Sequence, residues 1–222
     1  MKVIKPSFET FEDLTDPAFA VMVMRKLEVI GRTCYKSENC ITEESGRKFV
    51  RKLIEHGHEA MLEHVSISVK FTVDRGVSHE LVRHRMASFA QESTRYCNYS
   101  NEKFGSETTV IKPCFYQEYS EEYDLWKAAM ENAEYKYFQL LNAGSTPQEA
   151  RSVLPNSLKT ELIITANEVE WQHIIDLRFS GVTGAPHPQM KEAMSKIVEN
   201  LYFESEGRLY YDPKVFGGMK NE

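Results

Sequence analysis

The chain has 222 residues, of which 41% are hydrophobic, and a formal net charge of −6. This length can bury one sizeable core, and no linker, low-complexity run or internal repeat divides the sequence, so we expect a single domain over residues 1–222. The acidic balance argues against a general nucleic-acid binder, which needs a broad basic face to neutralise phosphates.

Cysteine usage and the N-terminus indicate where the protein resides. The four cysteines form no Cys-x-x-Cys pair, so we expect free thiols in a reducing compartment; they are Cys34, Cys40, Cys97 and Cys114. None has a neighbouring His or Lys in sequence to lower its pKa, and we therefore expect no cysteine nucleophile. The sequence begins without a secretory pattern, and the early apolar run 18–24 is too short to span a bilayer. These features predict a soluble, cytoplasmic protein.

The first sixty residues predict a strand and two helices. Residues 1–9 alternate weakly between polar and apolar, as an edge strand does. Asp16 and the proline after it predict the start of a helix that runs to about Tyr35. A second helix is expected from Thr42, as its cap, to Gly57, as its stop. Their apolar stripes are Phe19, Val23, Leu27 and Ile30 in the first helix, and Phe49, Val50, Leu53 and Ile54 in the second.

Histidines and glutamates cluster in the segment 56–64, whose sequence is HGHEAMLEH. Such a group raises the alternative of a metal site. A zinc-binding helix places its histidines four residues apart, however, whereas His79 and His84 are five apart. Ligands can also come from distant segments, so a metal-dependent hydrolase stays open as an alternative; its candidate ligands are His58, His64, His79 and His84.

The strand that follows is the clearest in the chain. Apolar residues at every odd position of 65–73 alternate with polar ones, which predicts one core face and one polar face. Ser78 is then expected to cap a short helix that delivers Glu80, Arg83 and His84 to a site.

Residues 83–96, RHRMASFAQESTRY, place three arginines, a histidine and three serine or threonine hydroxyls in one stretch. If the segment is extended, side chains two apart share a face, so Arg83 pairs with Arg85 and Ser93 with Arg95. Guanidinium forks beside hydroxyls suit a phosphate dianion, because each N–H to oxygen bond is charge-assisted. A solvated basic strand is the alternative, but the interleaved hydroxyls favour a site for a small anion.

The second half of the chain predicts three helices and a strand. Ser120 is expected to cap a long helix that Gly144 ends. Thr146 and Glu149 form a capping box for a short helix that carries Arg151.

A strand is expected over residues 158–166, followed by a helix that Asn167 and Glu170 cap. One face of this helix combines apolar residues with an arginine, at Trp171, Ile174, Ile175 and Arg178. An arginine at that position either reaches for solvent or is held for a ligand.

The arginine stretch resembles the signature of the flavin-dependent thymidylate synthases. That signature reads Arg-His-Arg, two variable residues, Ser, four further residues, Ser, one variable residue and Arg. Its fixed positions are met by Arg83, His84, Arg85, Ser88, Ser93 and Arg95. Ala90 stands where the family usually has Asn. The segments 150–155 and 167–178 are also similar to segments of this family.

The resemblance implies an α/β fold: a single compact domain with a central, mostly antiparallel sheet flanked by helices. It is not a Rossmann fold, in keeping with the lack of a glycine-rich dinucleotide fingerprint. The implied reaction is the reductive methylation of dUMP to dTMP, with methylenetetrahydrofolate as carbon donor and NADPH as reductant through FAD. The implied assembly is a homotetramer with active sites at subunit interfaces, without nucleic-acid or membrane partners.

The resemblance also implies roles for individual residues. Arg178 would be the catalytic residue that activates the substrate, and no metal is expected. The substrate-binding residues would be Glu80, Arg83, Gln91, Glu92, Ser93, Thr94, Arg95, Arg151 and Arg178. The cofactor-binding residues would be His58, His64, Arg83, His84, Arg85, Gln91, Asn167, His173 and His187. Besides the metal-dependent hydrolase, a non-catalytic nucleotide-binding protein without flavin remains an alternative.

Overall fold

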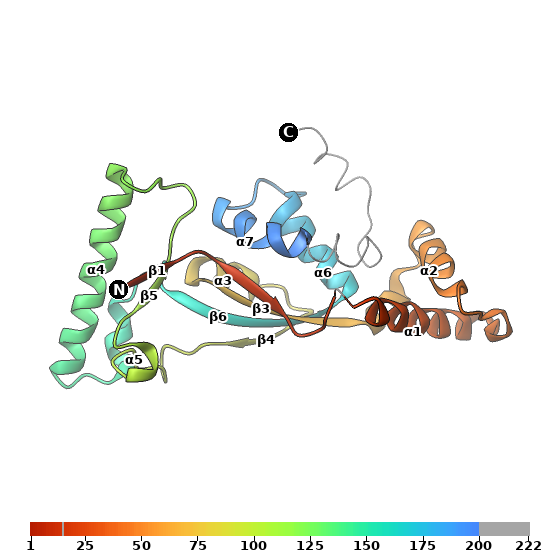
Figure 1. Cartoon of the computed structure of the whole chain (residues 1–222), viewed down its shortest axis with the longest axis horizontal. Helices are drawn as coiled ribbons and strands as arrows, with labels where there is room; N and C mark the ends of the chain where they lie inside the picture. The colour runs from red at the N-terminus through yellow and green to blue at the C-terminus, as the bar shows by residue number, and fades with distance from the viewer. Residues whose placement is uncertain (15, 200–222) are drawn as a thin grey trace.

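The computed structural model describes residues 1–14 and 16–199. The chain forms a central antiparallel sheet with helices on one face and a helical extension at each end (Figure 1). The predicted single domain reaches residue 222, and its last part, 200–222, lies outside the described residues. The strands are β1 (Lys2–Ile4), β2 (Ser7–Thr10), β3 (Ser66–Asp74), β4 (Ser88–Gln91), β5 (Thr109–Ile111) and β6 (Lys159–Asn167).

The central sheet has the strand order β2-β3-β6-β4, and every pair in it is antiparallel. The two long strands β3 and β6 pair over their whole length, from Ser66 opposite Asn167 to Asp74 opposite Lys159. This sheet confirms the expected α/β fold with a mostly antiparallel sheet. The strands β1 and β5 form a separate parallel pair, so the segment 1–9 contributes to two sheets rather than forming one edge strand.

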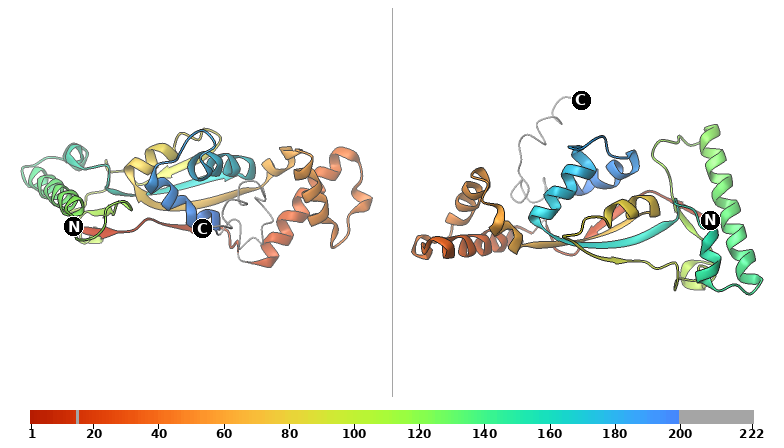
Figure 2. Two further views of the ribbon diagram at one scale, coloured as in Figure 1. Left: turned by 90° about the horizontal axis from the view of Figure 1, so that it is seen from above. Right: turned by 180° about the vertical axis from the view of Figure 1, so that it is seen from behind.

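Alternation along β3 determines which face of the sheet is covered. Ile67, Val69, Phe71 and Val73 are fully buried, while the polar residues between them are exposed or half-buried. Helices α3 (Arg75–Leu81), α6 (Glu168–Ile175) and α7 (Pro188–Glu199) lie on the buried face (Figure 2). In the part of the chain that the structure describes, no helix covers the opposite, polar face (Figures 1 and 2). That face is left for solvent or for another subunit.

Trp171 anchors α6 to the sheet. Its ring stacks on Phe71 with centroids 6.4 Å apart, and its Nε1 donates to the Ile67 carbonyl at 3.0 Å. Ile174 and Ile175 are also buried, which confirms the apolar stripe predicted for this helix. The helix ends in η5 (Asp176–Ser180), one turn of π-helix that carries Arg178.

Helices α1 (Pro17–Tyr35) and α2 (Ser45–Glu55) extend beyond one end of the sheet (Figure 1). Asp16 caps α1 as predicted, since its carboxylate accepts from Ala18 N at 2.8 Å. The expected start of α2 at Thr42 is wrong, because Thr42 instead closes a local turn in which its N–H donates to Ser45 Oγ at 2.8 Å. Short 3₁₀ turns follow α1 and α2, as η1 (Glu38–Cys40) and η2 (Glu59–His64).

Two predictions around the arginine stretch are wrong. Asp74, not Ser78, caps α3: its Oδ1 accepts from Val77 N at 2.8 Å, and Ser78 lies inside the helix with its hydroxyl donating to Arg75 O. The stretch is also not extended throughout. Residues 82–87 turn between α3 and β4, so Arg83 and Arg85 do not share a strand face.

Helix α4 (Glu121–Asn142) stands at the other end of the sheet (Figure 1), and Ser120 caps it as predicted. Tyr137 is its one buried residue. The capping box of Thr146 and Glu149 is confirmed and starts α5 (Pro147–Ala150). The remaining 3₁₀ turns are η3 (Glu102–Phe104) and η4 (Arg151–Val153). Among the helices of the described residues, none combines the length and apolarity needed to cross a membrane.

Candidate active site

Arg178 is the most tightly held cation of the site. Its Nη1 donates to Glu80 Oε2 at 2.9 Å, its Nη2 to the Glu80 carbonyl at 3.0 Å, and its Nε to His84 Nε2 at 3.1 Å. The side chain retains 21% of its exposure. A guanidinium has five N–H donors, so two remain for a ligand. A π-turn, which often marks a functional position, supplies the backbone that points this side chain at Glu80.

His84 is a neutral partner of Arg178. Its Nε2 accepts from the guanidinium, so its proton lies on Nδ1, which is 3.5 Å from Glu170 Oε1. Burial, together with the charge of Arg178 and the neighbouring His173, lowers the pKa of His84 to about 4. Both ring nitrogens therefore face protein groups, and His84 orients Arg178.

A second cluster gathers Arg95 and Arg151. Arg151 Nη1 donates to Thr94 Oγ1 at 3.3 Å, and the backbone N–H of Arg95 donates to Ser93 Oγ at 3.3 Å. Gln148 Oε1 accepts from Arg95 Nε at 3.1 Å. Both arginines are exposed, and neither forms an ion pair with any of the described residues. Two exposed guanidinium groups with no carboxylate partner among the described residues, beside two hydroxyls, are suited to a phosphate dianion.

The side chains of Gln91 and Glu92, which were predicted to contact substrate, are hydrogen-bonded within the protein. Gln91 Nε2 donates to Ser78 Oγ at 2.9 Å and to Thr160 at 3.3 Å. Glu92 accepts from Lys159 Nζ at 2.8 Å and from the Tyr99 hydroxyl at 3.1 Å. These bonds hold the backbone just before Ser93, and the contact of the two residues with substrate stays a prediction.

The predicted cofactor residues lie in several places. Arg83 and Arg85 are exposed and make no ion pair within the described chain. His173 is exposed with its ring centroid 5.7 Å from that of His84. Asn167 caps α6, as predicted, by accepting from Glu170 N at 2.9 Å.

Three predicted histidines lie away from these groups. His58 lines a cavity between α1 and α2, and His64 ends η2 with its carbonyl accepting from Lys26 Nζ at 2.6 Å. His187 precedes α7, where its Nδ1 accepts from Gln189 N at 3.3 Å. No hydrogen bond or ring contact among the described residues joins these histidines to the Arg178 cluster.

The two arginine clusters come from either side of β6 in the sequence. Arg151 precedes this strand, and Arg178 follows it on η5, where it contacts Glu80 of α3. Among the described residues, no hydrogen bond joins one cluster to the other.

Sequence reasoning missed Gln148 and Lys159. Gln148 lies in the capping box that starts α5, three residues before Arg151, and this proximity is the signal that could have identified it. Nothing in the sequence pairs Lys159 with Glu92, because the contact depends on the register between β6 and the end of β4.

Two other chemistries, a metal site and a cysteine nucleophile, can be compared with the geometry of the described residues. The described residues contain no group of three or more His, Cys, Asp or Glu side chains placed to hold a metal ion. Burial raises the pKa of the Cys97 and Cys114 thiols, which keeps both in the less nucleophilic protonated form.

Comparison with known proteins identifies the family. The sequence model described as thymidylate synthase complementing protein matches residues 22–202. The flavin-dependent thymidylate synthase of Pyrococcus furiosus is 34% identical over 141 residues, which cover 62% of this chain and 56% of that protein. The chain belongs to the flavin-dependent thymidylate synthase family.

A second relative and a solved structure are also similar to this chain. The flavin-dependent thymidylate synthase of Corynebacterium glutamicum is 31% identical over 172 residues, covering 69% of this chain and 66% of that synthase. The chain thus spans between 56% and 66% of the length of these two synthases. A crystal structure of the UMP/dUMP methylase PolB from Streptomyces cacaoi, bound with 5-Br dUMP, superposes with a TM-score of 0.71 at 19% identity, covering 98% of this chain and 97% of that one. This likeness establishes the shared fold.

Proposed function

We propose that the chain catalyses the reductive methylation of dUMP to dTMP, with methylenetetrahydrofolate as carbon donor and NADPH as reductant through FAD. The observation that carries this proposal is the Arg178 guanidinium, held by Glu80 and His84 with two N–H donors left over. In a member of this family, such a fixed pair of donors matches the need to activate a uracil ring.

Uracil C5 is a poor nucleophile, and no cysteine in the described site is activated to add to the ring. The enzyme must therefore draw electron density into the ring by stabilising negative charge on N3 and the carbonyl oxygens. A guanidinium can do this, because it stays charged and donates two parallel bonds. Preorganised donors in a partly dry site are among the strongest contributors to catalysis.

The phosphate of dUMP would bind at Arg95 and Arg151, with the Ser93 and Thr94 hydroxyls as further donors. These guanidinium groups are exposed and have no carboxylate partner among the described residues. The hydrogen bonds of Gln91 and Glu92 support this segment in one conformation before substrate arrives.

The residues present also fit FAD. Arg83 and Arg85 are exposed guanidinium groups without an ion pair in the described chain, as a diphosphate would require. The exposed ring of His173 meets His84, the residue between them in sequence, edge-on at 5.7 Å between centroids. When bound, FAD supplies the reducing equivalents that it takes from NADPH. Arg83 and Arg85 would neutralise the diphosphate, while Asn167 and His173 would contact the remainder of the cofactor.

Assembly into a homotetramer would bring the Arg95 and Arg151 cluster of one subunit to Arg178 of another. Two features support this proposal: no helix of the described residues covers the polar face of the sheet, and α4 buries one residue within the chain. Leu125 and Tyr135 of α4 are 66% and 58% exposed, so both side chains are available to a subunit contact.

We further propose that residues 1–222 act as one domain. We also propose that the protein works in the cytoplasm, because its four cysteines are unpaired, as is usual in a reducing compartment.

Spectroscopy tests the cofactor assignment. Purified protein, or protein incubated with FAD and desalted, should show the absorption bands of an oxidised flavin, and these should bleach on anaerobic addition of NADPH when dUMP is present. A preparation that stays colourless after incubation with FAD contradicts the proposal and favours a nucleotide-binding protein without flavin. UMP is the comparison ligand for dUMP, since the structural neighbour is named for both nucleotides.

A further inference from the structure

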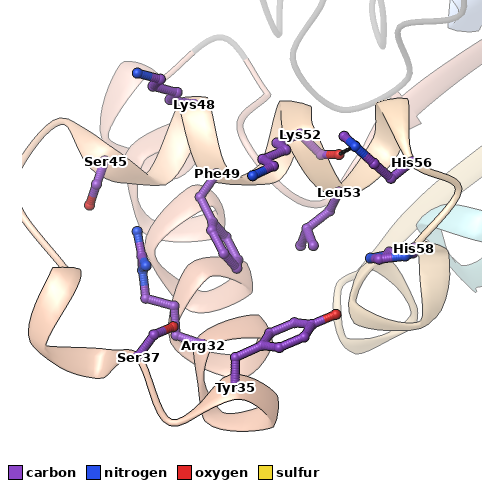
Figure 3. Close-up of a pocket in the computed structure, with 10 residues that line it drawn as sticks. All are labelled: Arg32, Tyr35, Ser37, Ser45, Lys48, Phe49, Lys52, Leu53, His56 and His58. Atoms are coloured by element: carbon purple, nitrogen blue, oxygen red, sulfur yellow. Dashed lines mark hydrogen bonds between the residues drawn. The ribbon is translucent and has the colours of Figure 1, made fainter.

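A cavity of about 700 Å³ lies between α1 and α2 (Figure 3), and none of its lining residues belongs to either arginine cluster. Its walls come from the last turn of α1 and the residues after it, from one face of α2, and from the histidines that follow α2. The lining residues are Arg32, Tyr35, Ser37, Ser45, Lys48, Phe49, Lys52, Leu53, His56 and His58.

The lining is cationic. It contains an arginine and two lysines but no carboxylate, although the whole chain carries a net charge of −6. Lys48 and Lys52 lie one helical turn apart, where like charges repel each other. Neither ammonium group forms an ion pair with any of the described residues. A bound anion would relieve this repulsion.

Arg32 is built into the wall of the cavity. Its Nε lies 2.7 Å from Oε1 of Glu28, a carboxylate that is itself fully buried. Its guanidinium lies over the Phe49 ring at 4.6 Å from the centroid. This close packing of α1 on α2 requires glycine at position 31, because a Cβ on Gly31 would lie 2.6 Å from Phe49 Cε1. The remaining donors of Arg32 are thus held in place before any ligand binds.

The cavity also offers aromatic and apolar surface. Tyr35 is 60% exposed, and its hydroxyl points toward His58 across the opening (Figure 3). Phe49 lies between Arg32 and Lys52, and Leu53 lies farther along α2, toward His58 (Figure 3). Ser37 and Ser45 add hydroxyl donors. A planar ring attached to two or more negative groups would match both kinds of surface.

We propose that this cavity binds the anionic, aromatic end of a co-substrate. The inference rests on the proposed function, which supplies two molecules of this chemistry: NADPH, with phosphates on an adenosine, and methylenetetrahydrofolate, with glutamyl carboxylates on an aromatic ring. Lys48 and Lys52 bind the negative groups, while Tyr35 contacts the ring. His58, which lines the cavity, is itself one of the residues predicted to bind the flavin cofactor.

The test replaces both lysines with uncharged residues of similar size, in Lys48→Gln/Lys52→Gln. The matched control, Lys5→Gln/Arg51→Gln, removes the same charge from exposed positions that do not line the cavity, one of them on α2 itself. Losing two charge-assisted contacts should raise the KM for one co-substrate about tenfold or more. The kcat, the flavin content and the Kd for dUMP should stay at wild-type values, and the control should match wild type throughout.

Two comparisons of substrates distinguish NADPH from methylenetetrahydrofolate as the molecule that the cavity binds. A raised KM for NADPH but not for NADH, which lacks the 2′-phosphate, indicates that the cavity holds phosphate. A raised KM for methylenetetrahydrofolate that is larger for the triglutamate than for the monoglutamate indicates that it holds carboxylates. If both KM values are unchanged while wild type is active, the inference is wrong and the proposed function stands. If wild type neither binds FAD nor forms dTMP, the proposed function fails, and fluorescence titration with NADPH and folate still decides whether the lysines bind them.

Discussion

Arg178 and Glu80 are joined twice, through the Glu80 carboxylate at 2.9 Å and through the Glu80 backbone carbonyl at 3.0 Å. Glu80 of α3 therefore holds both terminal nitrogens of the Arg178 guanidinium. The carboxylate also compensates part of its positive charge. Glu80 is a positioning residue in this account, and its substitution should affect turnover through Arg178.

We expect Glu80→Ala to lower kcat about 10- to 100-fold, the effect of losing a hydrogen bond to a charged group, because the guanidinium loses its carboxylate partner. Glu80→Gln should retain most of the turnover, since the amide oxygen can still accept from Nη1. Steady-state kinetics at saturating dUMP measures both variants. Equal losses in the two variants would show that the negative charge of Glu80, rather than the orientation it provides, matters.

Arg95→Ala and Arg151→Ala should each raise the KM for dUMP by about 10- to 100-fold, because each removes a charge-assisted contact to the phosphate. Turnover of deoxyuridine, which has no phosphate, should stay as slow as with wild type. A comparable loss with the nucleoside would mean that these arginines stabilise the fold or the assembly instead of binding phosphate.

At a dUMP concentration well below the KM of Arg95→Ala, mixing the Arg95→Ala and Arg178→Ala proteins should restore part of the activity after their subunits exchange, because some interfaces then combine an intact Arg95 with an intact Arg178. Exchange is verified by mass spectrometry of intact, isotopically labelled assemblies. If activity does not recover after verified exchange, each site is built within one chain.

The neutral state of His84 predicts a pH-dependent stability. Folded His84 has a pKa of about 4, compared with 6.5 for an unperturbed histidine, so the unfolded chain binds more protons between these two values. The free energy of unfolding should therefore fall as the pH falls from 6.5 toward 4. In His84→Gln, whose amide oxygen can still accept from Arg178 Nε, this fall should be shallower. Urea unfolding across the pH series measures both slopes, and identical slopes would mean that His84 titrates normally.

Much of the fold could be predicted from local patterns. The caps at Asp16, Ser120 and Asn167 depend on a few neighbouring residues, and alternation along β3 determines its buried face. The failures arose where two local signals compete. Thr42 has the chemistry of a cap but closes a turn with Ser45.

The site was harder to predict than the fold, because its contacts join distant segments. The family resemblance predicts roles for Arg178 and His84, but no sequence pattern indicates that the first donates to the second across 94 positions. The turn at 82–87 likewise buries His84 and exposes Arg83, which an extended reading of the same residues did not anticipate.

The most direct test of the central claim is the formation of dTMP by wild type and by Arg178→Ala, followed by mass spectrometry with dUMP, methylenetetrahydrofolate, NADPH and FAD present. Wild type should add one methyl group to dUMP only in the complete mixture. Arg178→Ala should retain its flavin and lose on the order of 10² to 10³ in kcat, with little recovery in Arg178→Lys, since an ammonium cannot reproduce the planar fork. Normal turnover by Arg178→Ala at saturating dUMP, or no dTMP from flavin-loaded wild type, would contradict the account.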